Sequence, residues 1–255
     1  MSVSSRKVII VTGSSSGIGA AVARRAAREN FNVLVNYNSN RAGAEEVVTY
    51  CHGQGVDAVA VGADIGEDAA CHALVGVAEE SWGRVDILVN NAGTTKFCPH
   101  GDLDGLDAED FHRLYQVNAV GAFQMIRAVV PVMKRSGGSI VNVASVAGLK
   151  GVGSSLAYAC SKAAMLAINQ SMARELGPEI QVNAVCPGMV EGEWLREGLG
   201  DELYPAVEQH YKDRAPMGAI MTADTVADNI WFFAVGASNV TGEHLLLDGG
   251  ATLPY

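Results

Sequence analysis

The sequence contains few cysteines, and none of them is placed to pair with another. Their number is odd and they include no C-x-x-C spacing: Cys51, Cys71, Cys98, Cys160 and Cys186. This usage is typical of reduced thiols in the cytoplasm and argues against a disulfide scaffold. The six histidines also lack the spacing of metal ligands, so we expect no metal site.

Long hydrophobic runs and positive charge are scarce as well. No run approaches the roughly 18 apolar residues of a membrane span, and residues 1–7 lack the apolar core of a signal peptide. Basic residues number 18 against 28 acidic ones, a net charge of −10, whereas nucleic-acid phosphates require clustered Lys and Arg. We therefore expect a cytoplasmic protein that binds neither membranes nor nucleic acids, although one local site for a small phosphorylated ligand is compatible with this charge.

Linkers, repeats and low-complexity segments are missing, and only 18% of the residues are charged. With 255 residues, 49% of them hydrophobic, the chain can bury a substantial core. A single domain covering residues 1–255 is the simplest prediction. Association between copies of the chain would explain part of the hydrophobic excess.

Seven short runs rich in apolar and β-branched residues are spaced along the chain as strands would be. They cover residues 7–12, 31–37, 56–61, 86–89, 139–143, 180–185 and 244–247. Helix-forming segments separate them; the two longest are residues 108–133, interrupted by Asn118 and Gly121, and residues 157–176. This alternation predicts an α/β fold with a doubly wound parallel sheet and helices on both faces, in which ligands bind beyond the carboxyl ends of the strands.

A glycine-rich turn follows the first expected strand and reads Gly13-Ser14-Ser15-Ser16-Gly17-Ile18-Gly19. Such a turn can cradle phosphate, because Gly13 permits a tight turn, Gly17 lets the backbone approach a pyrophosphate, and Gly19 lets the following helix pack closely. Its spacing, G-x-x-x-G-x-G, differs from the common dinucleotide fingerprint G-x-G-x-x-G.

The same turn also fits G-x-S-x-G, the nucleophile elbow of α/β-hydrolases, with Ser15 as the nucleophile. Asp224 or Asp228, together with His244, would then complete a triad. An elbow normally follows several strands, whereas this turn follows the first, so a hydrolase is the weaker alternative.

The end of the second expected strand carries no acidic residue and reads Asn36-Tyr37-Asn38-Ser39-Asn40-Arg41. An Asp or Glu at this place usually holds the ribose 2′-hydroxyl of NAD, and it would repel a 2′-phosphate. Asn38, Ser39 and Arg41 can instead bind that phosphate, so NADP(H) is favoured over NAD(H). A solvated Arg41 at the start of a helix is the structural alternative.

Tyr158 and Lys162 are four residues apart in a segment that favours a helix, so they share one face with Cβ atoms about 5–6 Å apart. An ammonium group this close favours the phenolate, which predicts a pKa for Tyr158 below its usual value of about 10, suited to acid–base work. Ser145, just after the fifth expected strand, can hydrogen-bond a substrate oxygen in the same cavity. Taken alone, the three residues also fit a surface Lys, a half-buried Tyr and a Ser that begins a turn.

Further motifs accompany these residues in order: Asp64-Ile65, Asn90-Asn91-Ala92-Gly93, Asn118, Pro187-Gly188 and Asp248-Gly249-Gly250. With the Thr12-Gly-x-x-x-Gly-Ile-Gly19 turn, Ser145 and Tyr158-x-x-x-Lys162, they cover essentially the whole chain, which resembles the short-chain dehydrogenase/reductase family. The resemblance implies a Rossmann-like sheet with the strand order 3-2-1-4-5-6-7, and hydride transfer between a nicotinamide and a carbonyl or alcohol carbon.

The resemblance also implies roles for single residues. Tyr158 would be the acid or base and would also contact the cofactor, and Ser145 would bind the substrate oxygen. Lys162 would hold the nicotinamide ribose, and Asn118 would keep a water in a proton relay to it. The remaining cofactor contacts would be Gly13, Ser15, Ser16, Gly17, Ile18 and Gly19 at the pyrophosphate, Asp64 and Ile65 at the adenine, Asn91, Ala92 and Gly93 at the ribose, and Pro187, Gly188 and Val190 at the nicotinamide.

Three positions depart from the family pattern. Gly192 stands where the family often has a Thr that fixes the nicotinamide, and Ser16 stands where many NADP(H)-preferring members have Arg or Lys. The latter weakens the preference for NADP(H). Cys160 takes the place of a smaller residue, which we interpret as neutral packing.

By the same resemblance, residues 190–217 are expected to form a lid over the substrate, and residues 94–100 the opposite wall. The helical segments 108–133 and 157–176 resemble those that pair across two-fold interfaces, which favours a homotetramer; helices that merely cover the sheet are the alternative.

The function expected from these residues is that of an NADP(H)-dependent oxidoreductase of a ketone or secondary alcohol, working as a reductase. A 3-oxoacyl thioester is one candidate substrate. An NAD(H)-dependent sugar or polyol dehydrogenase is the second hypothesis. A non-catalytic nucleotide sensor is disfavoured, because Ser145, Tyr158 and Lys162 are all present.

Overall fold

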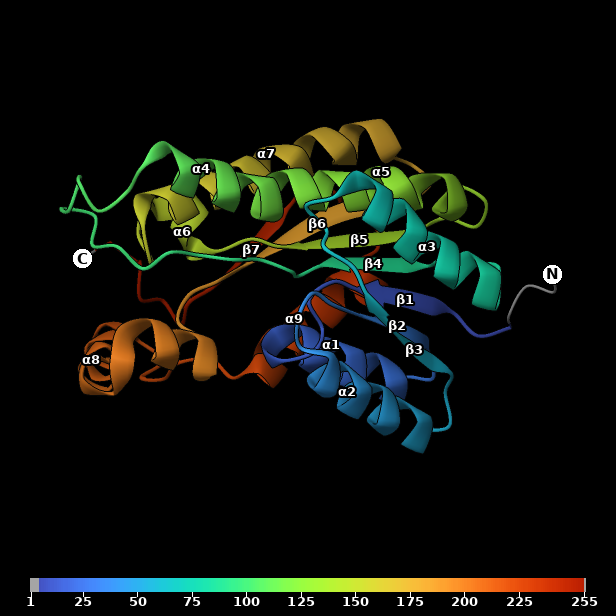
Figure 1. Ribbon diagram of the computed structural model, residues 1–255, viewed down its shortest axis with the longest axis horizontal. Helices are drawn as coiled ribbons and strands as arrows, with labels where there is room; N and C mark the ends of the chain where they lie inside the picture. Colours follow the sequence, from blue (N-terminus) through green and yellow to red (C-terminus); the bar gives the residue numbers. More distant parts are fainter. Residues whose placement is uncertain (1–4, 255) are drawn as a thin grey trace.

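The computed structural model describes residues 5–254; residues 1–4, part of the N-terminal stretch discussed above, and Tyr255 lie outside the described residues. Seven strands form one sheet in which each neighbouring pair is parallel (Figure 1). They are β1 (Val8–Val11), β2 (Asn32–Tyr37), β3 (Ala58–Gly62), β4 (Ile87–Asn90), β5 (Gly138–Val143), β6 (Ile180–Pro187) and β7 (His244–Leu247). Their order, β3-β2-β1-β4-β5-β6-β7, confirms the predicted doubly wound sheet.

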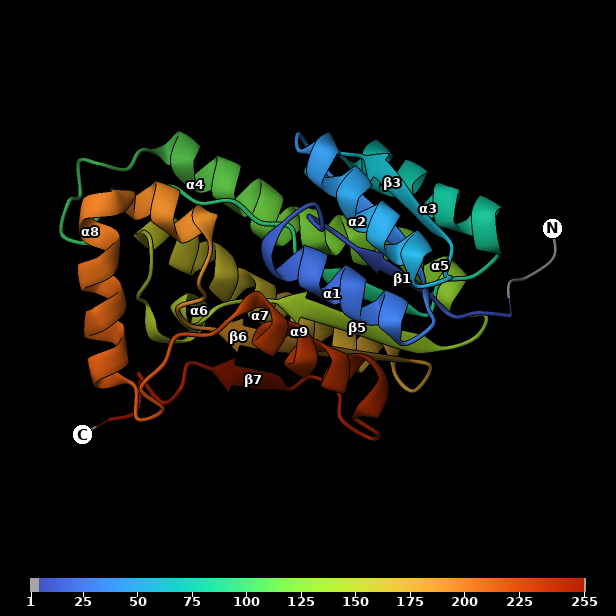
Figure 2. The same cartoon turned by 90° about the horizontal axis from the view of Figure 1, so that it is seen from below.

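Helices cover both faces of the sheet. They are α1 (Gly17–Arg28), α2 (Arg41–Gly53), α3 (Asp68–Trp82), α4 (Ala108–Tyr115), α5 (Ala122–Met133), α6 (Val146–Lys150), α7 (Leu156–Leu176), α8 (Glu193–Arg214) and α9 (Ala223–Trp231). Helices α1, α2 and α9 lie side by side on one face (Figure 2), and α3, α5 and α7 lie on the other (Figure 1). Among the described helices, none has the length and apolar character needed to cross a membrane.

The two helical layers bury opposite sides of the same strands. In β1, Ile9 and Val11 pack toward α1 and α9, whereas Val8 and Ile10 pack toward α3 and α5, and all four are fully buried. Successive side chains of a strand point to opposite faces, and a parallel sheet covered on both faces therefore needs continuous apolar runs. This is why the strands could be recognised in the sequence without any alternation of polar residues.

The expected helix over residues 108–133 is divided in three. Between α4 and α5 lies a π-helical segment, Gln116–Gly121, which contains both residues expected to interrupt the helix. A Cβ at Gly121 would lie 2.8 Å from Ile65 Cδ1, so the glycine lets this segment approach the end of β3. A π-helical turn is rare and is frequently found at functional sites, and Asn118 lies at the centre of this one.

The region expected to form the lid is mainly helical and lies apart from the two helical layers (Figure 1). Helix α8 is not continuous, because Gly200 has φ 78° and ψ 156°, a backbone conformation that glycine adopts readily. The short piece before Gly200 carries Trp194, and the longer piece after it carries Tyr204 and Tyr211. Near the end of the chain, helix α9 is followed directly by a short π-helical turn, Phe232–Gly236.

Candidate active site

Residues at the carboxyl ends of β1 and β4 are joined by hydrogen bonds. The Asn91 side chain donates to the backbone oxygens of Thr12 and Gly13, each at 2.9 Å. The Thr12 hydroxyl accepts from the backbone nitrogens of Asn91 and Ala92, each at 3.0 Å. The glycine turn and the segment after β4 therefore form one unit, as expected for ligand binding beyond the strand ends.

The three glycines of the turn differ in what surrounds them. Gly13 has φ +59°, and a Cβ there would lie 2.8 Å from the Cα of Ala92. A Cβ at Gly19 would lie 2.5 Å from both Gly13 O and Asn91 Nδ2. The close approach predicted for Gly19 is therefore made to the turn itself, not to the body of a strand. Gly17 also has positive φ, but nothing lies within 4 Å of its missing Cβ.

The open side of the turn fits a dinucleotide pyrophosphate. Helix α1 begins at Gly17, and its N-cap residue, Ser16, makes no side-chain capping bond. The start of a helix carries unpaired N–H groups and the positive end of the helix dipole, which together attract phosphate. Ser15 and Ile18 are half-buried while Ser16 and Gly17 are exposed, so the turn presents its backbone outward.

Asn36, at the end of β2, is hydrogen-bonded to the glycine turn. It was not identified as a site residue from the sequence. Its Oδ1 accepts from Gly13 N at 3.0 Å, and its Nδ2 donates to Val61 O and Ala63 O at 3.3 and 3.0 Å. Asn36 is buried, so it positions the turn and the end of β3 instead of facing a ligand. A buried polar residue needs several partners, and only the folded structure supplies them.

Helix α2 begins against the glycine turn, which places the predicted 2′-phosphate residues beside it. Asn40 caps α2 by accepting from Gly43 N at 3.0 Å, and a Cβ at Gly43 would lie 2.5 Å from Ser15 O. Asn38, Ser39 and Arg41 are all exposed next to this contact. An Asn followed three residues later by Gly, before a helical run, was the only sequence signal for this arrangement.

Arg41 already has a partner on its own helix. Its Nε lies 2.6 Å from Glu45 Oε1, one turn further along α2, and its side chain is 74% exposed. The hydrogen bond to Glu45 raises the pKa of Arg41, so the guanidinium is charged at every relevant pH. An incoming phosphate would compete with Glu45 for this group.

The residues predicted at the adenine follow β3. Ile65 is buried, and its backbone oxygen accepts from Gln124 Nε2 at 2.8 Å, which ties it to α5. Asp64 is exposed and its Oδ1 accepts from Gly66 N at 2.8 Å. Because β3 pairs with β2, this segment lies next to the tip that carries Asn38 and Arg41.

Tyr158 and Lys162 lie on the first turns of α7, as predicted. Ser155 caps the helix by accepting from Tyr158 N at 3.2 Å. Lys162 is only 3% exposed, and its Nζ donates to Val143 O at 2.8 Å at the end of β5. The ammonium group therefore lies beneath the tyrosine ring, 5.8 Å from its centroid.

The prediction that the pKa of Tyr158 lies below its usual value is wrong for this structure, because burial outweighs any effect of Lys162. Burial raises the pKa of Tyr158 to about 12, and a hydrogen bond with Ser145 opposes this only in part. Burial also lowers the pKa of Lys162 to about 8, against a weaker opposing effect of Cys186. Desolvation disfavours both charged forms, and the lysine is directed to a backbone carbonyl instead of the phenol. At neutral pH the phenol is therefore protonated and able to donate.

Ser145 is the N-cap of α6, a short helix not foreseen from the sequence. Its Oγ accepts from Ala147 N at 3.1 Å and donates to Pro187 O at a long 3.4 Å. The bond from Ala147 N fixes the Ser145 oxygen. The bond to Pro187 O is long, so the hydroxyl proton can turn toward another acceptor. Ser145 and Tyr158 therefore provide two neighbouring hydroxyl donors.

Asn118 is buried beneath the segment after β4. Its Oδ1 accepts from Thr94 N at 2.8 Å, and its Nδ2 donates to Thr94 O and Ser161 Oγ, each at 2.9 Å. A Cβ at Gly93 would lie 3.2 Å from Asn118 Oδ1 and 3.5 Å from Lys162 Nζ. The π-helical turn thus brings Asn118 to the chain segment that covers Lys162.

The loop after β6 is held between β7 and the lid. Gly188 N donates to Leu247 O at 2.7 Å, and Val190 forms a bridge with Met221. A side chain at Gly188 would collide with the Tyr211 hydroxyl, which donates to Asp248 O at 2.8 Å. Pro187, Gly188 and Val190 are thereby fixed beside Ser145, and the lid is anchored at its far end.

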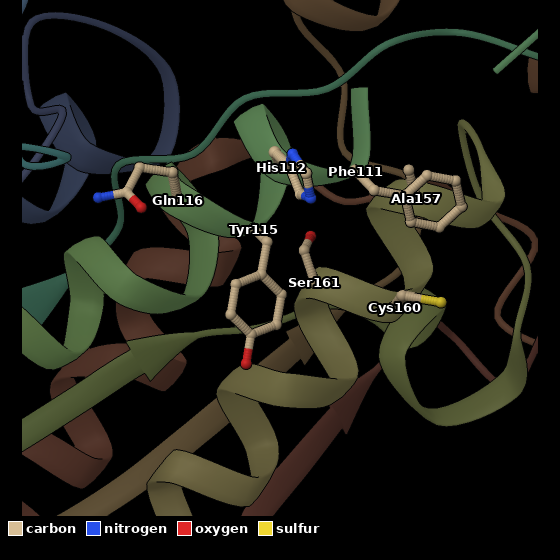
Figure 3. Close-up of a pocket in the computed structure, with 7 residues that line it drawn as sticks. All are labelled: Phe111, His112, Tyr115, Gln116, Ala157, Cys160 and Ser161. Atoms are coloured by element: carbon tan, nitrogen blue, oxygen red, sulfur yellow. The ribbon is translucent and has the colours of Figure 1, made fainter. Parts of the chain in front are cut away.

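One cavity of the described residues lies away from these groups. It has a volume of about 330 Å³ and lies between α4 and α7 (Figure 3), lined by Phe111, His112, Tyr115, Gln116, Ala157, Cys160 and Ser161. Tyr158 and Lys162 do not line it, so it is not where the predicted catalytic residues meet. Within the part of the chain that the structure describes, no group of His, Cys, Asp and Glu is arranged to hold a metal ion.

Comparison with known proteins places this geometry in a family. A family profile described as "Enoyl-(Acyl carrier protein) reductase" matches residues 13–252. A crystal structure from Burkholderia xenovorans, described as a short-chain dehydrogenase/reductase, is 38% identical with a TM-score of 0.91, and the match covers 98% of this chain and all of that one. The chain belongs to the short-chain dehydrogenase/reductase family. It is accordingly an NAD(P)-dependent oxidoreductase of alcohol and carbonyl groups.

Two further members of the short-chain dehydrogenase/reductase family are similar over almost their full length. A Streptomyces violaceoruber protein assigned as ketoacyl reductase 2 of the granaticin polyketide synthase is 38% identical over 247 residues, 96% of each chain. The structure of an NAD+-bound xylitol dehydrogenase is 30% identical with a TM-score of 0.88, covering 96% of this chain and 98% of that one. The elbow interpretation of Ser15 is inconsistent with this membership, and Asp228 is paired with Arg25 at 2.5 Å.

Proposed function

We propose that this enzyme transfers hydride between NADP(H) and a ketone or secondary alcohol, and that it works mainly as a carbonyl reductase. The observation that carries the proposal is the grouping of Tyr158 with Ser145 and with the buried Lys162, whose Nζ donates to Val143 O and lies 5.8 Å from the centroid of the tyrosine ring. Burial raises the pKa of the Tyr158 phenol to about 12, so it is a proton donor at neutral pH, and it lies beside a second donor, Ser145. A site built to protonate a carbonyl oxygen needs such donors.

Each catalytic residue has a distinct task in this proposal. The Tyr158 hydroxyl gives its proton to the substrate oxygen in reduction and takes it back in oxidation. The Ser145 hydroxyl donates a hydrogen bond to the same oxygen and thereby orients the carbonyl. Lys162, held by Val143 O, places a positive charge beneath the phenol and disperses the negative charge that develops there.

The remaining predicted residues would hold the cofactor, which when bound supplies the hydride in reduction and accepts it in oxidation. The glycine turn and the start of α1 would bind the pyrophosphate; residues 91–93 and Lys162 would bind the ribose, and Asp64 and Ile65 the adenine. Pro187, Gly188 and Val190 would border the nicotinamide. Asn118 supports the segment over Lys162 through Thr94, and we retain the proton relay as its further role.

Steady-state and binding measurements on the purified enzyme test the proposal. NADPH and NADH are titrated first, and reduction of a panel of ketones is then followed by the loss of nicotinamide absorbance. We expect NADPH to bind more tightly and ketones to be reduced. Binding of NADPH with no turnover of any carbonyl or alcohol would favour the nucleotide sensor, and failure of both nucleotides to bind would contradict the role of the glycine turn.

The second candidate is an NAD(H)-dependent sugar or polyol dehydrogenase, favoured by the likeness to xylitol dehydrogenase. Preference for NADH with faster oxidation of polyols than reduction of ketones would support it. The ketoacyl reductase relative favours a 3-oxoacyl thioester among possible ketones, and both substrates belong in the panel.

The preference for NADP(H) depends on Arg41. We expect Arg41→Ala to weaken NADPH binding about tenfold, because it removes a charge-assisted hydrogen bond to the 2′-phosphate, and to leave NADH binding unchanged. Glu45→Gln is the matched variant. It frees Arg41 from an exposed ion pair, so NADPH should bind up to about fivefold more tightly. Isothermal titration calorimetry measures both; equal weakening of the two nucleotides by Arg41→Ala would mean that Arg41 acts through α2 instead.

The remaining proposals concern organisation. We infer one domain over residues 1–255, with residues 190–217 as its lid, in a cytoplasmic protein. We also infer a homotetramer that pairs through the outer faces of α4, α5 and α7, where Tyr115, Phe123 and Cys160 are exposed. Tyr115 and Cys160 line the cavity of Figure 3. Sedimentation equilibrium should give four times the monomer mass, and Tyr115→Glu should reduce it; a monomeric wild type would contradict the inference.

A further inference from the structure

An exposed tryptophan of the lid lies between two other aromatic rings. The Trp194 ring centroid is 6.2 Å from that of Tyr158, with the planes at 53°, and 5.8 Å from that of Phe97, with the planes at 60°. The three rings come from α8, α7 and the loop after β4. Trp194 is 49% exposed, whereas the other two tryptophans, Trp82 and Trp231, are buried. Much of this ring therefore remains accessible next to the proposed proton donor.

The Phe97 ring packs against helix α8 of the lid at Gly198. A side chain at Gly198 would overlap the Phe97 ring, so this position must lack a Cβ for the two segments to meet. Trp194 and Gly198 are one helical turn apart and share a face of α8. Glycine inside a helix costs about 1 kcal/mol relative to alanine, and here it permits the contact with Phe97. The lid and the opposite wall are therefore in close contact where Phe97 meets Trp194 and Gly198.

The loop that carries Phe97 is fixed, and its polar groups are engaged with one another. Cys98 N donates to Ser154 O at 2.8 Å, and the hydroxyls of Thr95 and Ser154 are 2.6 Å apart. Lys96 Nζ lies 2.5 Å from Asp110 Oδ2. The hydroxyls of Thr95 and Ser154 and the cation of Lys96 are therefore engaged within the protein, and Phe97 offers an apolar ring beside Trp194.

We propose that Phe97 and Trp194 form a wall that selects the substrate, and that the preferred substrate is a ketone carried on a flat, apolar ring. This inference rests on the proposed carbonyl reduction and names its substrate class. Tilted aromatic rings bind another aromatic ring edge-to-face or offset, which gives affinity beyond the area buried. A polyol would need several hydrogen-bond partners, and the hydroxyls of Thr95 and Ser154 already bond to each other.

A matched pair of ketones tests this selection. 2-Tetralone and 2-decalone share a fused two-ring skeleton and an unconjugated carbonyl, and only the first has an aromatic ring. We expect the ratio of their kcat/KM values to favour 2-tetralone about tenfold, the size of aromatic contacts with two rings. Phe97→Leu and Trp194→Leu keep an apolar side chain but remove a ring, and each should reduce the ratio to within about threefold. Phe232→Leu, which alters an exposed aromatic residue of the π-helical turn after α9, is the control and should leave the ratio unchanged.

A binding measurement separates this inference from the proposed function. Isothermal titration calorimetry measures 2-tetralol and decahydro-2-naphthol binding, with saturating NADPH and again without nucleotide; both partners are reduced, so no reaction occurs. Tighter binding of 2-tetralol than of decahydro-2-naphthol, lost in Trp194→Leu, supports the wall even if no ketone is turned over. Absence of turnover would overturn the proposed carbonyl reduction but not the wall. Equal affinities in the wild type, or a preference that survives both leucine variants, would overturn the wall whatever the activity.

Discussion

Tyr158→Phe should lower kcat for ketone reduction by about three orders of magnitude, the range known for loss of a general acid. Phe keeps the ring and its contact with Trp194 but lacks the hydroxyl that protonates the substrate oxygen. Because the glycine turn and Arg41 are untouched, the dissociation constant of NADPH should stay within about twofold of the wild-type value. Single-turnover measurement of nicotinamide oxidation, together with calorimetric titration of NADPH, checks both expectations.

The pH dependence gives an independent readout of the same residue. Since the pKa of Tyr158 is raised to about 12 and that of Lys162 is lowered to about 8, kcat/KM for reduction should stay nearly constant up to neutral pH, decline as Lys162 loses its charge, and fall further as the phenol loses its proton. Oxidation needs the deprotonated form, so its kcat/KM should rise with pH, approaching tenfold per unit well below that pKa. Tyr50→Phe is the control and should alter neither profile, because it removes a hydroxyl of α2 whose partner is Arg28 of α1. Residual activity of Tyr158→Phe above a tenth of wild type would assign the proton to another group.

The reversed sign of the Tyr158 shift shows what spacing in a sequence can and cannot give. The i,i+4 spacing correctly placed Tyr158 and Lys162 on one face of α7. It could not reveal that Val143 O, brought by β5, would take the lysine's hydrogen bond, or that the surrounding protein would desolvate both groups. The first depends on a residue 19 positions from Lys162, and the second on segments still further away, such as the one that carries Trp194.

The fold was more predictable than the site for a related reason. Strand order and helical layers follow from hydrophobic runs and the handedness of crossovers, which are properties of whole segments. The role of Asn36 and the contact of Gly198 with Phe97 depend on long-range contacts. The same holds for α6, whose start depends on the bond between Ser145 and Ala147 and on the approach to β6. Single polar residues and single glycines carry these contacts, and neither creates a pattern in the sequence.

Gly19→Ala should weaken NADPH binding at least a hundredfold and lower the free energy of unfolding by about 1–3 kcal/mol, the usual cost of forcing extra volume into a packed region. The added methyl group would lie 2.5 Å from both Gly13 O and Asn91 Nδ2, and the nearest atoms include backbone that cannot turn aside. Either α1 moves away from the turn or the hydrogen bond from Asn91 to Gly13 O breaks. Both changes displace the exposed backbone at Gly17 that would bind the pyrophosphate. Urea denaturation and calorimetric titration of NADPH measure the two effects.

Gly76→Ala is the matched control, because it makes the same chemical change inside a helix where space is available. Nothing lies within 4 Å of a Cβ at Gly76 in α3, so alanine should stabilise the enzyme by about 0.5–1 kcal/mol and leave NADPH binding unchanged. Opposite signs for the two variants would separate the crowding at the turn from the general effect of glycine in helices. If Gly19→Ala is destabilised yet binds NADPH normally, Gly19 serves only to pack α1, and the pyrophosphate must be held by another part of the chain.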